Sequence, residues 1–369
     1  MATNNRGVFT LKTSAAQRSK GYWPTVLTTW FENQDQGDMY HYGSVFTPAP
    51  TNLVSHCYRY DFANDSAAST FKSNLAIAGA DGVSNQTGFS SRWAGYFAGG
   101  FRYSPSPAQG GAFSFIGRVD YYNDTASVSS RANMSIARDC GNGASIANYG
   151  YMFGGGDYNA GSTSSRVDRF DYQNDTSASV GKGHLTASRT LLGGLGNKNY
   201  GYAAGGVDIT PNPKVLNSII DRIDYSNDTA TALLKGPLSA SRTSFHGAGN
   251  RDYGYFGGGS TAFPSTTPSM VTIVDRVDFA NDTIAATPKG NLIESSGLYD
   301  EALPQAKPRI AGSNSQNAWF GASTSATNVC RIDFNNDTVT ATKQVLLLHI
   351  LLVLLQYVEP KMIWMVDIF

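Results

Sequence analysis

The chain has 369 residues, enough for one large domain or for two or three smaller ones, and its 28 basic residues balance its 28 acidic residues. This balance excludes a general nucleic-acid binder and a polyanionic surface. Charged residues make up only 15% of the chain, whereas glycine (39), Tyr (20) and Phe (19) are abundant. A polar, weakly charged sequence with many glycines is typical of short strands joined by tight turns.

Residues 1–23 precede the repeats described below, and we expect them to form an N-terminal arm that is ordered only against a partner. They contain no apolar run, so we expect no secretory signal. The three cysteines, Cys57, Cys140 and Cys330, are far apart and show no metal-ligand spacing. We therefore expect buried free thiols and no disulfide framework.

One ten-residue block recurs six times, as CYRYDFANDS, IGRVDYYNDT, VDRFDYQNDT, IDRIDYSNDT, VDRVDFANDT and VCRIDFNNDT. The Asp before its closing Ser or Thr falls at 65, 124, 175, 228, 282 and 337, so successive copies are 59, 51, 53, 54 and 55 residues apart. An aromatic-glycine block such as YGYFGGG precedes most copies, and a small-residue stretch with a central Arg, such as LSASRTS, comes before that. Such internal repetition predicts an array of similar supersecondary units.

Each unit is predicted to hold four short strands. The first is the stretch with the central Arg, the second the aromatic-glycine block, the third the Arg-Val/Ile-Asp block, and the fourth follows Asn-Asp-Thr. Asn and Asp favour turns because they bond their own backbone and tolerate left-handed geometry. Residues 24–343 are therefore predicted to form one all-β domain of six four-stranded units.

These units resemble kelch repeats. The resemblance is carried by the unit length and by glycine doublets at Gly99-Gly100, Gly155-Gly156, Gly205-Gly206 and Gly258-Gly259. The aromatic-Asp pair of kelch units appears in reversed order, as in Asp120-Tyr121, and the Trp that usually follows it is absent, so this is a divergent relative. The resemblance implies a β-propeller with six blades, or seven if the termini supply one.

The Arg and Asp two residues apart on the third strand could, taken alone, pass for a catalytic pair. They recur in every unit, whereas a catalytic pair is needed once, so we interpret them as structural pairs between blades. The residues concerned are Arg118, Asp120, Arg169, Asp171, Arg222, Asp224, Arg276, Asp278, Arg331 and Asp333.

No catalytic or metal-binding residue is predicted, and we expect a protein that is not an enzyme and needs no cofactor. The five histidines are scattered, and the sequence has no phosphate loop, G-x-S-x-G or H-E-x-x-H motif. Galactose-oxidase-like copper enzymes use kelch-type propellers, but nothing here picks out the Tyr, Cys and His that they need. A copper enzyme remains the less favoured alternative.

Residues 344–369 break the repeat pattern: glycine disappears and leucine dominates. Three interpretations stay open, namely a closing strand or helix, a hydrophobic docking tail, and out-of-frame translation of a further repeat. The apolar run Val345–Leu355 is too short to span a bilayer, so we expect no membrane span.

The motifs at Tyr253–Gly259, Asp221–Thr229 and Lys235–Arg242 are similar to repeats of virion and tail structural proteins of marine and cyanobacterial bacteriophages. This resemblance implies a virion component, assembled in the host cytoplasm, whose partners are other tail or capsid proteins and a host-surface glycan. The alternative is a cellular kelch-like scaffold or lectin. Genes for portal, terminase and tail proteins nearby would favour the virion component.

The linkers between the second and third strands vary in length and are rich in Ser, Pro and Thr. They are predicted to emerge on one face of the propeller, where such folds usually bind. Aromatic side chains can stack on glycans. The candidate binding residues are therefore Phe101, Tyr103, Tyr158 and Phe263.

Overall fold

The computed structural model describes residues 38–45, 54–74, 82–84, 86–103, 111–139, 141–157, 160–263, 269–293, 310–321 and 328–346. The expected N-terminal arm lies outside these residues, as does the apolar C-terminal segment beyond Leu346. Of the three cysteines, Cys57 and Cys330 are buried and are not joined in a disulfide, and Cys140 lies outside the described residues.

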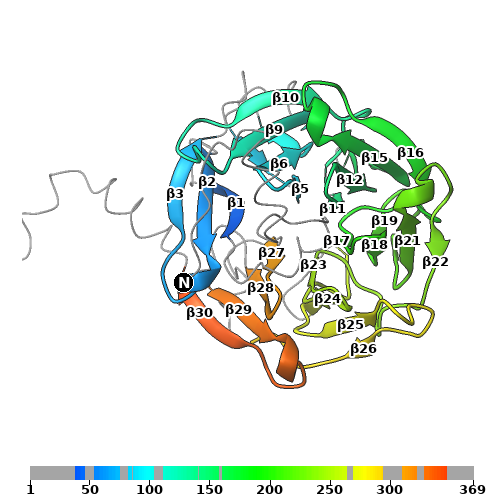
Figure 1. The fold of residues 1–369 in the computed structure, drawn as a ribbon. Coiled ribbons are helices and arrows are strands. Elements are labelled where there is room, and N and C mark those ends of the chain that lie inside the picture. The colour runs from blue at the N-terminus through cyan, green and yellow to red at the C-terminus, as the bar shows by residue number, and fades with distance from the viewer. Residues whose placement is uncertain are drawn as a thin grey trace, which may run out of the picture.

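Five units form four-stranded antiparallel sheets arranged around a centre (Figure 1). In chain order they are β5 (Thr87–Ser90), β6 (Ala94–Ala98), β9 (Phe115–Asp120) and β10 (Ser129–Asn133). Next come β11 (Asn142–Ser145), β12 (Tyr149–Phe153), β15 (Arg166–Asp171) and β16 (Val180–His184). The third sheet has β17 (Gly193–Gly196), β18 (Tyr200–Ala204), β21 (Ile220–Asp224) and β22 (Leu233–Leu234). The fourth has β23 (His246–Gly249), β24 (Tyr253–Gly257), β25 (Val274–Asp278) and β26 (Thr287–Pro288). The fifth has β27 (Ile310–Ser313), β28 (Asn317–Gly321), β29 (Asn328–Asp333) and β30 (Thr342–Leu346).

The first repeat copy forms a three-stranded sheet of β1 (Asp38–Val45), β2 (Val54–Asp61) and β3 (Thr70–Asn74), which lies in the ring between the β10 and β30 blades (Figure 1). The sequence predicted six or seven four-stranded blades, and the structure has five. A fourth strand of the first sheet would be sought before Asp38, and those residues lie outside the described part of the chain. The all-β propeller and its four-stranded blades are confirmed, and the blade number is corrected.

In three of the five blades the first strand differs from its predicted position, whereas β27 (Ile310–Ser313) lies within the predicted stretch KPRIAGSNS. The stretch with the central Arg is not the strand itself but the connection that leads into it: Arg138 precedes β11, Arg189 precedes β17, and Arg242 precedes β23. The first strands β5, β11, β17, β23 and β27 lie innermost, and each is next to the first strand of the neighbouring blade.

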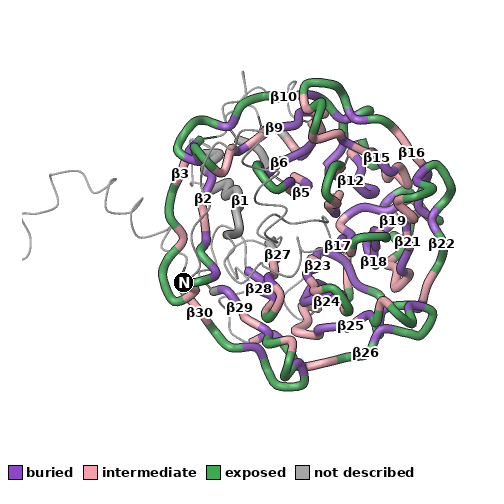
Figure 2. The backbone as a smooth tube through the Cα atoms, in the orientation of Figure 1, coloured by how far each residue is buried: buried purple, intermediate pink, exposed green. Residues whose placement is uncertain are grey.

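The hydrophobic core is divided among the interfaces between sheets. Phe89 and Tyr96 of one blade pack with Met152 and Phe170 of the next. Across the ring, six separate clusters of buried residues each combine side chains from two adjacent sheets. Figure 2 shows the buried stretches mainly in the middle strands and the exposed stretches at the turns and the outer rim. No blade buries its own apolar faces, so each depends on its neighbours.

The glycine pairs that follow β6, β12, β18 and β24 adopt positive φ, which other residues rarely adopt. In the third unit this pair is Gly154 and Gly155, with φ of 56° and 90°, so the doublet expected at Gly155-Gly156 is shifted by one residue. A Cβ on Gly155 would lie 2.5 Å from the carbonyl oxygen of Asp139, so the backbone approaches too closely for a side chain.

The connections between second and third strands form small sheets of their own. They are β13 (Gly156–Asp157) with β14 (Ser162–Thr163), β19 (Val207–Asp208) with β20 (Val215–Leu216), and β7 (Phe101–Tyr103) with β8 (Gly111–Ala112). The last of these sheets gains a third strand, β4 (Gly82–Ser84), which comes before the first strand of its blade. Because strands alternate in direction, these linkers lie at the opposite end of the blades from the turns that join first to second and third to fourth strands. We call these two ends the linker face and the turn face.

Candidate functional site

The arginines of the third strands bridge neighbouring sheets. Each guanidinium contacts the Asp of the next repeat's Asn-Asp-Thr/Ser turn, at nitrogen-oxygen distances between 2.7 and 3.0 Å. The pairs are Arg59–Asp124, Arg118–Asp175, Arg169–Asp228, Arg222–Asp282, Arg276–Asp337 and Arg331–Asp65. The last pair joins the final blade to the first sheet, so the contacts run around the whole ring.

Each acceptor Asp also receives other donors from the same neighbouring sheet. Asp228 accepts from Arg169 at 2.7 Å, from the Tyr151 hydroxyl at 2.9 Å and from Lys182 at 3.3 Å. Burial of Tyr151, followed by the nearby Asp228 charge, raises the pKa of this phenol. Charge-assisted hydrogen bonds of this kind are the stronger ones in proteins, and shared donors make them a local network.

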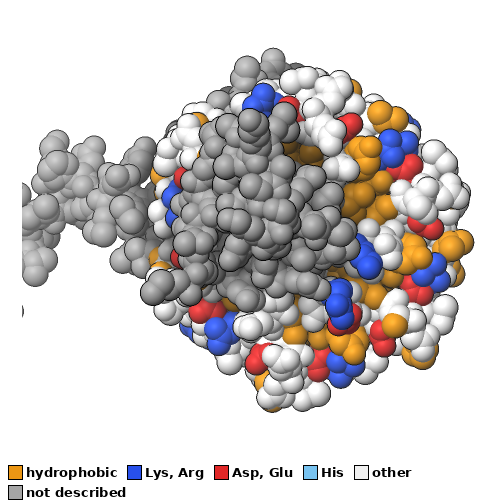
Figure 3. Space-filling model, in the orientation of Figure 1, with side chains coloured by type: hydrophobic (Ala, Val, Ile, Leu, Met, Phe, Trp, Pro, Cys, Tyr) orange, Lys and Arg blue, Asp and Glu red, His pale blue; other side chains and the backbone are white. Residues whose placement is uncertain are grey.

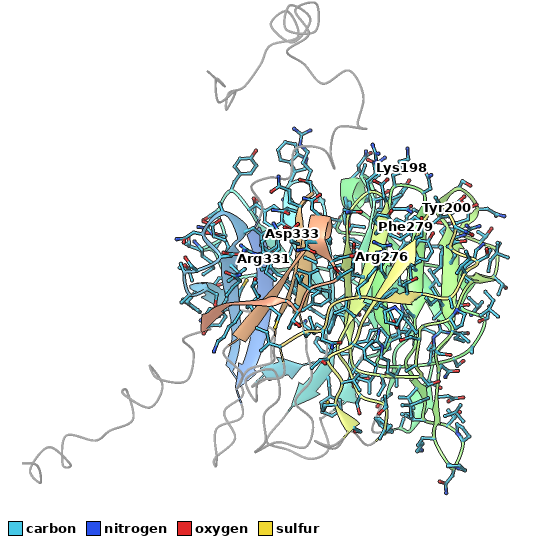
Figure 4. All side chains as sticks on the ribbon, turned by 90° about the horizontal axis from the view of Figure 1, so that it is seen from below. Lys198, Tyr200, Arg276, Phe279, Arg331 and Asp333 are labelled. Carbon is cyan, nitrogen blue, oxygen red and sulfur yellow. The ribbon has the colours of Figure 1, made fainter. Side chains whose placement is uncertain are left out.

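The aspartates two residues after these arginines were expected to pair between blades, but they cap turns within their own blades. Each caps the short turn that follows its strand, because its carboxylate accepts the backbone N–H two residues on at 2.8–3.0 Å. They are Asp120, Asp171, Asp224, Asp278 and Asp333. Only Asp120 also forms an ion pair within the described residues, at 3.3 Å from Arg118 of its own strand. Figure 4 shows Asp333 nearer the end of the ring than Arg331 and Arg276.

A second set of Arg-Asp pairs was missed by the sequence reasoning, which singled out the arginine before the first strand but gave it no partner. Arg189 and Asp221 are both fully buried and lie 3.0 Å apart, as Arg242 and Asp275 do at 2.9 Å. Arg138 and Asp168 are the third pair, at 3.5 Å. The sequence did contain a signal for these pairs: of the six copies, only these three units carry an Asp directly before the third-strand Arg.

The hydroxyl residue three positions before each buried Arg contacts the same Asp. The Thr186 hydroxyl donates to Asp221 at 2.7 Å, and the Ser135 hydroxyl donates to Asp168 at 2.6 Å. Burial alone would raise the pKa of Asp168, but Arg138 and the hydrogen bonds from Ser135 outweigh it and lower the pKa. The Ser or Thr and the Arg of the [Ser/Thr]-x-x-Arg pattern therefore hold the connection before the first strand of a blade against the third strand of the same blade.

The predicted binding aromatics do not form one described cluster. Phe101 lies in β7 and is half-buried, and Phe263 is half-buried in a separate linker. Tyr103 ends β7, but its side chain lies outside what the structure describes, and Tyr158 lies outside the described residues altogether. Their role in binding stays a prediction.

The turn face carries an exposed aromatic pair that the sequence reasoning also missed. Trp93 stacks on Tyr122 with ring centroids 5.9 Å apart and an interplanar angle of 25°. The Arg92 guanidinium carbon lies 4.6 Å from the centroid of the Trp93 ring. The sequence did contain a signal for this pair. Aromatic residues at these two positions depart from the repeat, because the corresponding turns of the other four-stranded units carry no aromatic residue at either position.

Charges of both signs alternate around the ring and no single-sign patch forms on the part of the face that Figure 3 shows in colour. Within the described residues, no group of three or more His, Cys, Asp or Glu is placed to hold a metal ion. The same residues include no helix with the length and apolar character that crossing a membrane requires.

No family model matches the chain, and no curated protein matches it. Among solved structures, one described as the structure of YjhT is similar, with a TM-score of 0.51 and 14% sequence identity. The match covers 69% of this chain and 82% of that chain. The chain shares the β-propeller fold. At this identity the likeness extends to the fold and no further.

Proposed function

We propose that this propeller is a non-enzymatic structural component of a bacteriophage virion, associated with the tail and used for assembly and for contact with the host surface. The observation that carries the proposal is the repeat itself, with its YGYFGGG, DRIDYSNDT and KGPLSASR motifs, which resembles the repeats of phage virion proteins. In this proposal its partners are other tail or capsid proteins and a host-surface glycan.

The geometry supports the proposal because it yields a ring that is braced at every interface. Six Arg-Asp contacts and six apolar clusters join neighbouring sheets, including the last to the first. A closed ring resists local opening, since one interface cannot separate without straining the others. Such a body suits a particle component that has to hold its neighbours at fixed positions.

The test is the composition of purified particles. We expect peptides of this chain in gradient-purified phage, at a constant ratio to a known tail protein across the particle peak, and tail-region labelling by a specific antibody in electron micrographs. Absence of the chain from particles, together with its presence in the soluble fraction of host cells, would contradict the proposal and favour the cellular scaffold or lectin.

A further inference from the structure

The pair Trp93–Tyr122 sits where two turns of one blade are tied together. The backbone N–H of Tyr121 donates to the carbonyl oxygen of Trp93 at 3.1 Å, so the residue after Tyr121 lies beside Trp93. The other four-stranded blades make the same contact, from Tyr172 to Asn148, Tyr225 to Asn199, Phe279 to Asp252 and Phe334 to Gln316, at 2.9–3.1 Å. The turns are therefore equivalent, and only their side chains differ.

The fold does not need aromatic residues at these two positions. In place of Trp93 the other four-stranded blades carry Asn148, Asn199, Asp252 and Gln316. In place of Tyr122 the other copies carry Ala63, Gln173, Ser226, Ala280 and Asn335. Both positions are aromatic in one copy alone, and both rings face solvent, with 48% of Trp93 and 79% of Tyr122 exposed. Keeping two large rings in water is unfavourable, and the other four four-stranded blades avoid it.

We infer that Arg92, Trp93 and Tyr122 form a carbohydrate-binding platform on the turn face. The apolar C–H face of a pyranose ring packs on an exposed aromatic ring, and its hydroxyls need polar groups at the edge of that ring. Tyr122 offers an open ring and its own phenol hydroxyl. Arg92 is exposed and forms no ion pair among the described residues, so its N–H groups are available to hydroxyls or to a sugar carboxylate.

Two other ligands fit the platform less well. A nucleic acid would need a basic surface, whereas the chain is neutral overall, with 28 basic and 28 acidic residues. A proline-rich peptide docks in a groove between aromatic ridges, whereas Trp93 and Tyr122 stack on each other and leave no groove between them. The glycan is thus the ligand that this geometry favours.

This inference deepens the host-contact part of the proposed function and rests on it only for the source of the glycan. It also differs from the sequence prediction, since the platform lies on the turn face and the predicted aromatics belong to the linkers. Particle composition tests the proposed function, and glycan binding by the isolated protein tests the platform, so either can fail without the other.

The experiment applies the purified full chain to an array of bacterial lipopolysaccharides, capsular polysaccharides and defined neutral and acidic oligosaccharides. The test variant combines Trp93→Asn with Tyr122→Ser, the residues that the chain itself carries at Asn199 and Ser226. The matched control is Phe71→Ser, which removes another exposed aromatic and introduces the residue found at Ser130 of the next copy. Thermal unfolding of all three proteins checks that they are folded.

We expect the chain to bind at least one glycan class, the double variant to lose at least about tenfold in affinity, and Phe71→Ser to bind like the parent chain. Arg92→Ala distinguishes acidic from neutral glycans as the ligand. If the guanidinium binds a sugar carboxylate, this substitution weakens the binding of acidic glycans more than that of neutral ones. If the double variant is unfolded, Tyr122→Ser alone serves, because that ring is mostly exposed. No glycan bound by the parent chain, equal binding by the folded variant, or binding of proline-rich peptides alone would overturn the inference.

Discussion

Arg331 and Asp65 are 266 residues apart in the sequence, yet their side chains form an ion pair of 2.8 Å. The Trp319 indole N–H donates to the same carboxylate at 3.0 Å, and the Phe62 ring stacks on Trp319 with centroids 4.0 Å apart. These contacts join the last blade to the first sheet. The seam that closes the ring thus uses the same Arg-to-turn-Asp contact as the interfaces between consecutive units, with a Trp where four of the other interfaces have a Tyr.

Asp65→Asn tests this seam. The substitution removes the charge that holds Arg331 and Trp319, and we expect it to lower the free energy of unfolding by about 1–3 kcal/mol, measured by urea denaturation. The control is Asp61→Asn in the same turn, whose carboxylate caps the turn by accepting the N–H of Ala63. Asn caps such turns about as well as Asp, so we expect little change there. Equal effects of the two substitutions would show that Asp65 does not brace the seam.

Gly290→Ala tests the close approach of neighbouring blades at the outer rim. The N–H of Gly290 donates to the Asp337 carbonyl at 2.7 Å, and an added Cβ would lie 1.7 Å from the carbonyl oxygen of Val339. Because that atom belongs to backbone, the blades must separate, and we expect a loss of about 1–3 kcal/mol in unfolding free energy.

The control for this prediction is Gly88→Ala on an inner strand, where no atom lies within 4 Å of the added Cβ. That change should be neutral or stabilise by up to about 1 kcal/mol, because alanine reduces the freedom of the unfolded chain. If Gly290→Ala is as stable as Gly88→Ala, the blades do not touch as closely as described.

The repeat spacing was enough to predict an array of four-stranded units that pack on one another, because six copies of one pattern cannot each form an independent core. The resemblance to kelch repeats, and not the spacing, implied that this array is a β-propeller. The pattern could not reveal the partner of each third-strand Arg. The Asp two positions after each Arg lies on the same strand and is the nearest candidate in the sequence. The observed partner lies instead in the next repeat, as Asp175 does for Arg118. Contacts between blades depend on the packing of neighbours, which sequence proximity does not report.

Two further differences have physical causes of the same kind. The central Arg looked like part of a strand, but the buried carboxylate of Asp221 or Asp275 holds it in the connection before the strand. The platform at Trp93 and Tyr122 was invisible because the two residues are 29 positions apart (122 − 93) and meet only through the contact between two turns. By contrast, the turn role of Asn-Asp-Thr is a local property, and the sequence sufficed to predict it.

Arg242→Met tests the buried pairs. This fully buried guanidinium donates to Asp275 at 2.9 Å and to the carbonyls of Phe256, Gly258 and Ile273 at 2.9–3.1 Å. Methionine fills a similar volume but leaves the Asp275 charge without its cation, so we expect a loss of about 3–5 kcal/mol. Asp275→Asn in the Arg242→Met background should recover part of this loss, because it removes the unpaired charge.

The control is Arg251→Met, which breaks an ion pair of 3.1 Å with Asp252 whose partners are 68% and 60% exposed. Exposed pairs contribute little, so its effect should stay within about 0.5 kcal/mol. A small effect at Arg242 and no recovery in the double variant would show that this pair does not lock the blade.

Tyr96 predicts how the propeller responds to alkaline pH. Burial, followed by the neighbouring Asp175 charge, raises the pKa of its phenol to about 12, whereas an unfolded tyrosine titrates near pH 10. Below pH 10 the phenol is protonated in both states, and its contribution to stability is fully present. Between about pH 10 and 12 the unfolded chain loses this proton and the folded chain keeps it, so rising pH favours unfolding by up to about 2–3 kcal/mol for this one group.

Tyr96→Phe removes this group from the titration while keeping its ring in the core. At pH 8 the variant should be slightly less stable, by about 1 kcal/mol at most, because the hydrogen bond to Asp175 is long at 3.3 Å. By pH 11 the gap should close or reverse, since only the parent chain still loses stability through Tyr96. Lysines and other tyrosines titrate in both proteins and cancel in the difference between their urea midpoints. A gap that stays constant from pH 8 to pH 11 would show that Tyr96 ionises as readily in the folded ring as in the unfolded chain.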